Sequence, residues 1–231
     1  MCGIVGAVCN RDVFGILIEG LKRLEYRGYD SAGLSLIDAN SCLNTQKTIG
    51  RVADLEDLFN GEIPNGGLGI AHTRWATHGV PSSANSHPHT SGSISVVHNG
   101  IIENHNLLKE ELRDRGITLS SETDSEVIAH LIDFYSSDTG SLKEAVNKTL
   151  SRLEGAYAIC VISKDYPDEM IGARSGSPLV IGLGIGENFM ASDQMALRQV
   201  TDRFIYLEEG DVAEVSKNGI SVFDDSGELV E

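Results

Sequence analysis

Apolar residues recur along the chain at two different spacings, and these spacings predict where strands and helices lie. The first apolar run, CGIVGAVC at 2–9, is typical of a short buried strand. Apolar residues then recur at helical spacing at 13, 16, 17, 20, 21 and 24, which predicts a helix. A polar loop extends from His72 to about Thr90. Further strands are expected at 33–38, 43–49 and 94–98.

The periodicity is helical in the middle of the chain and strand-like in its last third. Helices are predicted at 104–115, from the capping-box sequence TDSE at 123–126 onward, and at 141–153. Strands are predicted at 156–163, 169–174, 178–184, 188–192, 203–207, 211–215 and 219–223. Because strands and helices do not alternate one for one, the pattern favours one α+β domain over 1–231, with antiparallel sheets.

Length and charge exclude several classes of protein. A chain of 231 residues can bury a core without a metal or disulfide staple. Its 34 acidic and 18 basic residues give a net charge of −16, which repels nucleic-acid phosphates and anionic membranes. No stretch reaches the roughly 18 apolar residues of a membrane span, and the amino-terminal run lacks the basic residues of a signal peptide. We therefore expect a cytoplasmic protein.

The four cysteines, Cys2, Cys9, Cys42 and Cys160, have no spacing typical of disulfides, and three of them are expected to be buried and inert. Cys2 differs because removal of Met1 would give it a free α-amine. That amine has a pKa of about 7.7–8.0 and lies beside a thiol with a pKa of roughly 8.5. One residue could then supply both nucleophile and base. Alternatively, Cys2 is only a small residue at the start of a strand.

Five further residues carry groups suited to binding or catalysis. Arg74 is a planar cation that fits a carboxylate, and Trp75 beside it is the only tryptophan. Asn99 and Gly100 offer an amide and a backbone N–H for an oxyanion hole, and Asp124, at the first turn of a helix, could accept an ammonium. Taken singly, each has a structural alternative: a surface ion pair, a core anchor, an Asn-Gly hairpin turn, or a favourable helix dipole.

Six of the seven histidines, at 72, 78, 87, 89, 98 and 105, fall within 34 residues. A metal site is the alternative interpretation of this cluster. However, the cluster holds no cysteine and no H-E-x-x-H helix, and the segment His87 to His89 is rigid and extended. The glycines at 182–186 also lack dinucleotide-binding spacing. We therefore expect neither a metal nor a cofactor.

Seven segments occur in an order that resembles one family. They are CGIVG at 2–6, YRGYDSAG at 26–33, HTRWATHG at 72–79, HNGIIEN at 98–104, ETDSE at 122–126, ARSGSPL at 173–179 and ASDQ at 191–194. Together they resemble the glutaminase domains of the glucosamine-6-phosphate synthase family, which are N-terminal-nucleophile hydrolases. The resemblance covers essentially the whole chain. It implies a four-layer αββα sandwich of antiparallel sheets.

The resemblance also implies roles for the polar residues. Cys2 would attack the side-chain amide of L-glutamine to form a thioester, with its own α-amine as base. Asn99 and Gly100 would hold the oxyanion. The α-carboxylate would bind Arg74 and the α-ammonium would bind Asp124.

Further roles implied by the resemblance concern the rim of the pocket. Thr77 and His78 would complete the glutamine pocket, and the loop from Arg74 to about Pro81 would close over it. Trp75 would lie where ammonia leaves the domain, and Arg27 near the closing loop.

Family members continue into two sugar-phosphate isomerase domains that bind fructose 6-phosphate, and the full-length enzyme is expected to be a homo-oligomer. Without them, we expect this chain to hydrolyse glutamine but not to make glucosamine 6-phosphate. One alternative is an amidotransferase that feeds asparagine synthetase, amidophosphoribosyltransferase or glutamate synthase. Two others are a non-catalytic amino-acid sensor and a structural or metal-binding module.

Overall fold

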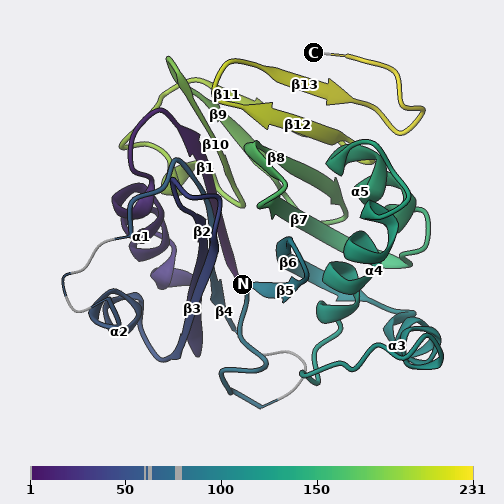
Figure 1. The fold of residues 1–231 in the computed structure, drawn as a ribbon. Coiled ribbons are helices and arrows are strands. Elements are labelled where there is room, and N and C mark those ends of the chain that lie inside the picture. The colour runs from purple at the N-terminus through teal and green to yellow at the C-terminus, as the bar shows by residue number, and fades with distance from the viewer. Residues whose placement is uncertain (1, 60, 62–63, 76–79, 231) are drawn as a thin grey trace.

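Two antiparallel sheets packed face to face form the centre of the molecule (Figure 1). The computed structural model describes residues 2–59, 61, 64–75 and 80–230. Within them, the first sheet has the strand order β11-β9-β10-β1-β4-β2-β3 and the second the order β13-β12-β8-β7-β6-β5. The strands of the first sheet are β1 (Gly3–Cys9), β2 (Ser31–Ile37), β3 (Leu43–Ile49), β4 (Leu68–Arg74), β9 (Val180–Leu183), β10 (Glu187–Ala191) and β11 (Phe204–Tyr206). Those of the second are β5 (His89–Ser91), β6 (Ile94–Ile102), β7 (Gly155–Ser163), β8 (Tyr166–Ser175), β12 (Val212–Ser216) and β13 (Ile220–Phe223).

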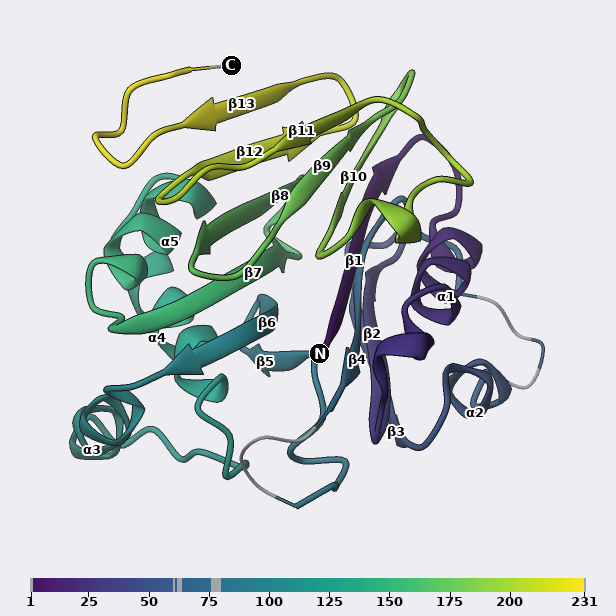
Figure 2. The same cartoon turned by 180° about the vertical axis from the view of Figure 1, so that it is seen from behind.

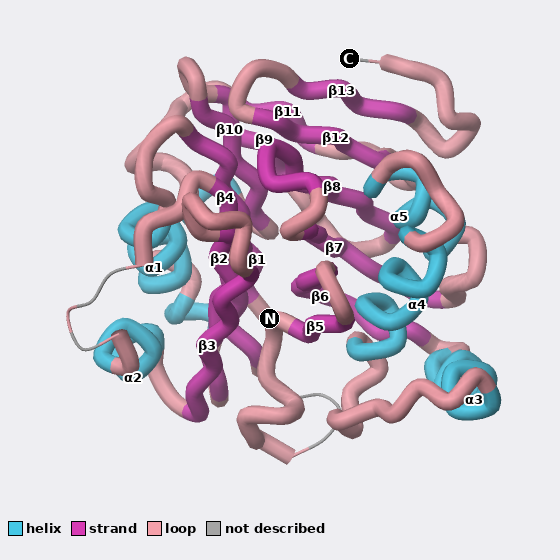
Figure 3. The backbone as a smooth tube through the Cα atoms, viewed as in Figure 1, coloured by secondary structure: helices cyan, strands magenta, loops and turns pink. Residues whose placement is uncertain are grey.

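Helices cover the outer face of each sheet, which gives four layers (Figures 1 and 2). The helices are α1 (Phe14–Lys22), α2 (Val52–Asp57), α3 (His105–Asp114), α4 (Glu126–Ser136) and α5 (Leu142–Leu150). Helices α1 and α2 pack on the first sheet, and α4 and α5 pack on the second (Figure 3). The predicted αββα sandwich is confirmed.

The position of strand β1, with both faces buried, explains why its sequence is continuously apolar. Side chains alternate across a strand, so Val5 and Ala7 join the core beneath α1. On the opposite face, Ile4 and Val8 join the core between the two sheets. Because both faces are buried, the strand shows no polar alternation. Its pairing with β10 on one side and β4 on the other fixes it in the middle of the first sheet.

Most predicted elements lie within a few residues of their expected positions, but the strand predicted at 94–98 is longer than expected. Strand β6 continues to Ile102, so Asn99 and Gly100 pair with Ala158 and Tyr157 of β7 instead of forming a hairpin turn. Pairing along the whole length of β7 overrides the local turn preference of Asn-Gly. Helix α2 and strand β5, which are short, are not among the predicted elements.

The predicted capping box at the start of α4 does not form. The N-cap is Ser125, without a side-chain cap, and Thr123 is hydrogen-bonded to His89 instead. The Glu126 carboxylate accepts hydrogen bonds from the backbone and hydroxyl groups of Ser120 and Ser121 at 2.7–2.8 Å. These bonds fix the segment before α4. Asp124 therefore precedes the helix and does not lie in its first turn.

Three cysteines were predicted to be buried, and two of them are. Cys9 and Cys160 are buried, whereas Cys42 is exposed in the turn between β2 and β3. A turn at the sheet edge leaves no second layer to cover this thiol. Among the described residues, no helix has the length and apolar character needed to span a membrane.

Candidate active site

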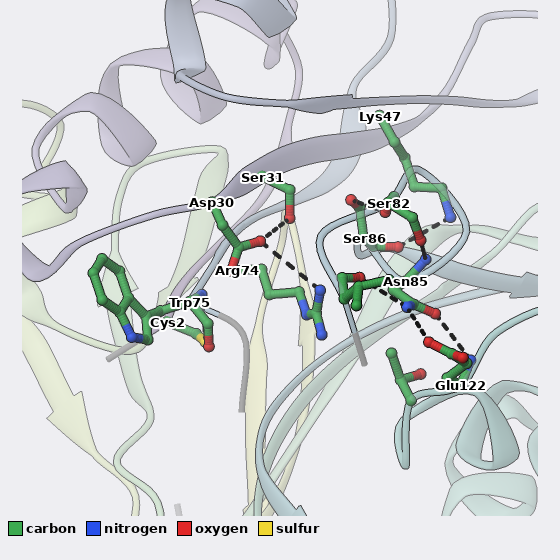
Figure 4. Close-up of polar contacts among 12 residues, drawn as sticks. Cys2, Asp30, Ser31, Lys47, Arg74, Trp75, Ser82, Asn85, Ser86 and Glu122 are labelled. Carbon is green, nitrogen blue, oxygen red and sulfur yellow. Dashed lines mark hydrogen bonds and ion pairs between the residues drawn. The ribbon is translucent and has the colours of Figure 1, made fainter. Parts of the chain in front are cut away.

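Cys2 lies at the amino-terminal end of the central strand β1, at the opening between the two sheets. The start of β1 is fixed by Ser192, whose hydroxyl accepts from Ile4 N at 3.0 Å and whose N–H donates to Ile4 O at 3.1 Å. The Cys2 thiol accepts a hydrogen bond from Trp75 N at 3.2 Å (Figure 4). The thiol predicted as the nucleophile thus contacts the backbone of Trp75, and Ser192 fixes the strand that follows it.

The surroundings of Cys2 favour a protonated thiol. Burial raises the pKa of the Cys2 thiol, while the Trp75 N–H and the Arg74 charge act in the opposite direction. Because the net effect is upward, the thiol holds its proton at neutral pH. A nucleophilic role for Cys2 therefore requires a nearby base to accept that proton.

Asn99 and Gly100 approach Cys2 from the opposite sheet. The Asn99 side-chain amide donates to Cys2 O at 3.1 Å, so the two sheets meet at this residue pair. Gly100 has φ of 133°, and a Cβ there would lie 2.0 Å from Ala156 O, which only glycine avoids. An amide group and a strand backbone N–H beside a thiol can together stabilise an oxyanion.

One cation and two carboxylates lie near the thiol. Arg74, at the end of β4, is only 4% exposed and forms an ion pair with Asp30 at 3.8 Å (Figure 4). Asp124 is 6% exposed, and its carboxylate accepts from Ile102 N at 2.8 Å. A cavity of about 30 Å³ is lined by Arg74, Asp124 and Cys2. The structure therefore brings together a buried cation, a buried anion and a thiol.

A second cavity, of about 350 Å³, lies on another side of the thiol. Its lining residues are Cys2, Arg27, Trp75, Asn99, Gly100, Ile101, Ser177, Pro178 and Ser192. Arg27 is ion-paired with Asp193, and its Nε donates to Tyr26 Oη at 3.2 Å. Cys2, Trp75 and Gly100 also line the smaller cavity. The predicted rim residues Arg27 and Trp75 thus lie beside the thiol, whereas Thr77 and His78 fall outside the described residues.

Asn85 anchors the segment that precedes Asp124. Its amide nitrogen donates to Val80 O at 2.9 Å and to Glu122 Oε2 at 3.1 Å, and its oxygen accepts from Glu122 N at 2.9 Å (Figure 4). Lys47 donates to Ser86 O at 3.0 Å. The Asn85 contacts join the segment after residue 80 to the loop that carries Asp124, and the Lys47 contact joins it to β3.

Four of the clustered histidines pack together behind these groups. The ring of His87 lies 4.2 Å from that of His72, 4.7 Å from that of His89 and 6.5 Å from that of His98. Burial lowers the pKa of all four, to about 3 for His72 and His89, so the rings are neutral at pH 7. Within the described part of the chain, no three His, Cys, Asp or Glu residues are grouped to hold a metal.

Hydrogen bonds connect three of these imidazoles to the site. His98 Nδ1 lies 2.7 Å from Ser125 Oγ, and His89 Nε2 lies 3.0 Å from Thr123 Oγ1, on the segment that carries Asp124. His72 Nε2 lies 2.9 Å from Asn99 Oδ1. The sequence marked these histidines as a cluster. It did not show which polar groups they contact, because the partners are 27 or more residues away.

Comparison with known proteins agrees with this arrangement. A family model described as a glutamine amidotransferase domain matches residues 72–199, more than half of the chain. The chain belongs to the glutamine amidotransferase family. Glutamine–fructose-6-phosphate aminotransferases (isomerizing) of Vibrio vulnificus and Yersinia pestis are each 58% identical to it over all 231 residues. The chain spans 38% of the length of each relative.

Solved structures confirm the N-terminal-nucleophile hydrolase type of fold. Glutamine phosphoribosylpyrophosphate amidotransferase from B. subtilis is 29% identical with a TM-score of 0.83, covering 99% of this chain and 50% of that one. A glutamine aminotransferase class-II domain protein from Silicibacter pomeroyi shares the fold at 17% identity and a TM-score of 0.61, covering 96% of this chain and 99% of that one.

The buried imidazoles predict that acid destabilises the domain. An unfolded histidine has a pKa near 6.5, whereas folded His89 has a pKa of about 3, so below pH 6.5 the unfolded chain binds more protons. Each such histidine then costs about 2 kcal/mol of unfolding free energy between pH 6.5 and 5. Urea unfolding at pH 7 and pH 5 should show a smaller loss for His89→Gln than for the unchanged protein. Equal losses in the two proteins would contradict the burial argument.

A second prediction concerns the packing of Trp75 on Gly28. A Cβ at Gly28 would lie 2.3 Å from Trp75 Cε3, so Gly28→Ala should displace the indole. Because Trp75 is the only tryptophan, its fluorescence emission reports the change directly. Gly116→Ala is the matched control, since Gly116 also has positive φ, at 81°, but faces open space. Gly116→Ala should lose about 1–2 kcal/mol to backbone strain. Gly28→Ala should lose more, because its φ of 91° and ψ of 151° lie in a region that is essentially restricted to glycine. Only Gly28→Ala should shift the emission; a shift in neither would refute the contact.

Proposed function

We propose that residues 1–231 form the glutaminase domain of a longer polypeptide and hydrolyse L-glutamine to L-glutamate and ammonia through a Cys2 thioester. One observation carries the proposal: the Cys2 thiol, the Asn99 amide, and the buried charges of Arg74 and Asp124 converge between the sheets. Family membership supports it, because glutamine amidotransferases take ammonia from glutamine. Relatives 58% identical to this chain are named aminotransferases that use glutamine.

The reaction begins once Met1 has been removed. The α-amine of Cys2 accepts the thiol proton, and the sulfur bonds to the amide carbon of glutamine. Asn99 Nδ2 and Gly100 N stabilise the oxyanion of the tetrahedral intermediate. The carbon–nitrogen bond then breaks, and the α-ammonium returns the proton to the departing ammonia. Water adds to the thioester, which releases glutamate and restores the thiol.

Substrate recognition follows from charge. Glutamine is a zwitterion, so its site needs one cation and one anion, and Arg74 and Asp124 supply them for the α-carboxylate and α-ammonium. Thr77 and His78 complete the pocket in this proposal. His87 is buried, lines the small cavity and has no hydrogen-bond partner for either ring nitrogen among the described residues. A polar end of the substrate can satisfy it.

The proposed acceptor of the ammonia is fructose 6-phosphate, bound by C-terminal isomerase domains that follow this domain in the full-length enzyme. The identity of 58% to aminotransferases that name this sugar phosphate, against 29% to the phosphoribosylpyrophosphate enzyme, favours that acceptor. Arg27 and Trp75, on the larger cavity, are the proposed gate for ammonia. We further propose a cytoplasmic, homo-oligomeric full-length enzyme that makes glucosamine 6-phosphate.

Mass spectrometry with an electrophilic glutamine analogue tests the proposal. The protein should lose Met1 and gain one adduct on Cys2, and Cys2→Ala should abolish hydrolysis, a loss of at least about 10³-fold, while still binding glutamine. Cys42→Ala is the matched control, because Cys42 is the exposed thiol and should not be needed. Glutamine hydrolysis by Cys2→Ala, or an adduct on Cys42 alone, would rule out the mechanism. Glutamine binding without turnover, after Met1 removal, would instead support an amino-acid sensor.

A further inference from the structure

The hydrogen bond between His72 and Asn99 joins the two sheets directly beside Cys2. His72 lies in β4, where it pairs with Ile4 of β1 and Gly33 of β2, so strands on both sides fix its backbone. Asn99 lies in β6 of the other sheet and pairs with Ala158 of β7. The distance from His72 Nε2 to Asn99 Oδ1 is 2.9 Å, and His72 is fully buried.

The partners of Asn99 determine which way its amide faces. The carbonyl oxygen of Cys2 can only accept a hydrogen bond, so the atom of Asn99 that contacts it at 3.1 Å is the NH₂ nitrogen. The amide oxygen therefore faces His72. Since that oxygen can only accept, His72 must carry its proton on Nε2. Burial keeps the ring neutral, with a pKa of about 3, so this single proton defines one tautomer.

Among the residues that the structure describes, one N–H of Asn99 has no other partner. One amide hydrogen is used by Cys2 O, and the amide oxygen is used by His72. The second amide hydrogen remains for the oxyanion of the tetrahedral intermediate, which is the substrate's amide oxygen after the Cys2 sulfur has bonded to the amide carbon. If the amide turned over, its oxygen would face that oxyanion and repel it. The terminal amide torsion of asparagine is broad, so the bond from His72 to the amide oxygen adds to the bond with Cys2 O in opposing this rotation.

We infer that His72 is a positioning residue, which donates from Nε2 to Asn99 and thereby holds the Asn99 amide with an N–H directed at the oxyanion. The inference rests on the proposed glutaminase function. His72 touches neither substrate nor sulfur in this role and acts only through Asn99. Loss of a whole oxyanion-hole donor lowers kcat by about 10²–10³-fold. Loss of the residue that orients the donor should cost less, about 10–100-fold.

Two substitutions at His72, with amide side chains of different length, test the inference. The Gln side chain in His72→Gln places its NH₂ near the position of the imidazole Nε2, whereas the shorter Asn in His72→Asn cannot reach Asn99. His72→Gln should retain most of kcat, and His72→Asn should lose about 10–100-fold, with KM for glutamine changed less than about 3-fold in both. Equal kcat values for the two variants would overturn the inference, as would a loss confined to KM.

An Asn99→Ala background separates positioning from a general structural role. If His72 acts through Asn99, His72→Asn should cause no further loss of kcat once Asn99 is Ala. The same fold loss in both backgrounds would overturn the inference. Thermal unfolding of each variant checks that the compared proteins are folded. If the unchanged protein, with Met1 removed, does not hydrolyse glutamine, the proposed function itself fails, and this result differs from every outcome of the His72 comparison.

Discussion

The packing of the two sheets against each other is the constraint on which the candidate site depends. The thiol belongs to the first sheet and the Asn99 amide to the second, and their relative position is set by the apolar core between them. Ile4 and Val8 of β1 pack in that core with Val97 of β6, two positions before Asn99. Protein interiors are densely packed and resist deformation, so the core holds the thiol and the amide at a fixed separation. Helices α1 and α4 cover the outer faces and stabilise this arrangement.

Electrostatics at the site are local and differ from those of the whole molecule. The net charge of −16 belongs mainly to the surface, where water and salt screen it. Beside the thiol, the relevant charges are Arg74 with its partner Asp30, and Asp124. The surrounding imidazoles are neutral because burial lowers their pKa values. A zwitterionic amino acid can thus find one complementary charge for each of its two charged groups.

The fold could be predicted from the sequence wherever the hydrophobic pattern dominated. Strand β1 and helices α1, α3 and α5 follow directly from spacing, because burial of a face determines each of them. Prediction failed where a tertiary contact outweighed a local signal. Asn99 and Gly100 have the sequence of a turn but pair with β7. In the TDSE segment, Thr123 forms a hydrogen bond with His89, and Glu126 accepts hydrogen bonds from two serines, so no capping box forms.

The sequence predicted which residues form the site but not the hydrogen bonds between them. The family resemblance identified Cys2, Arg74, Asn99 and Asp124, and the structure places all four around one opening. Their catalytic roles remain proposals. The bond from His72 to Asn99 could not be predicted, because it joins residues 27 apart on different sheets.

Glutamine turnover before and after removal of Met1 is the most direct test of a nucleophile and base within one residue. The processed protein should release glutamate and ammonia in equal amounts. The same chain with Met1 retained has an amide nitrogen in place of the amine, and its turnover should fall to background. Equal turnover by the two forms would contradict the central role of the Cys2 amine.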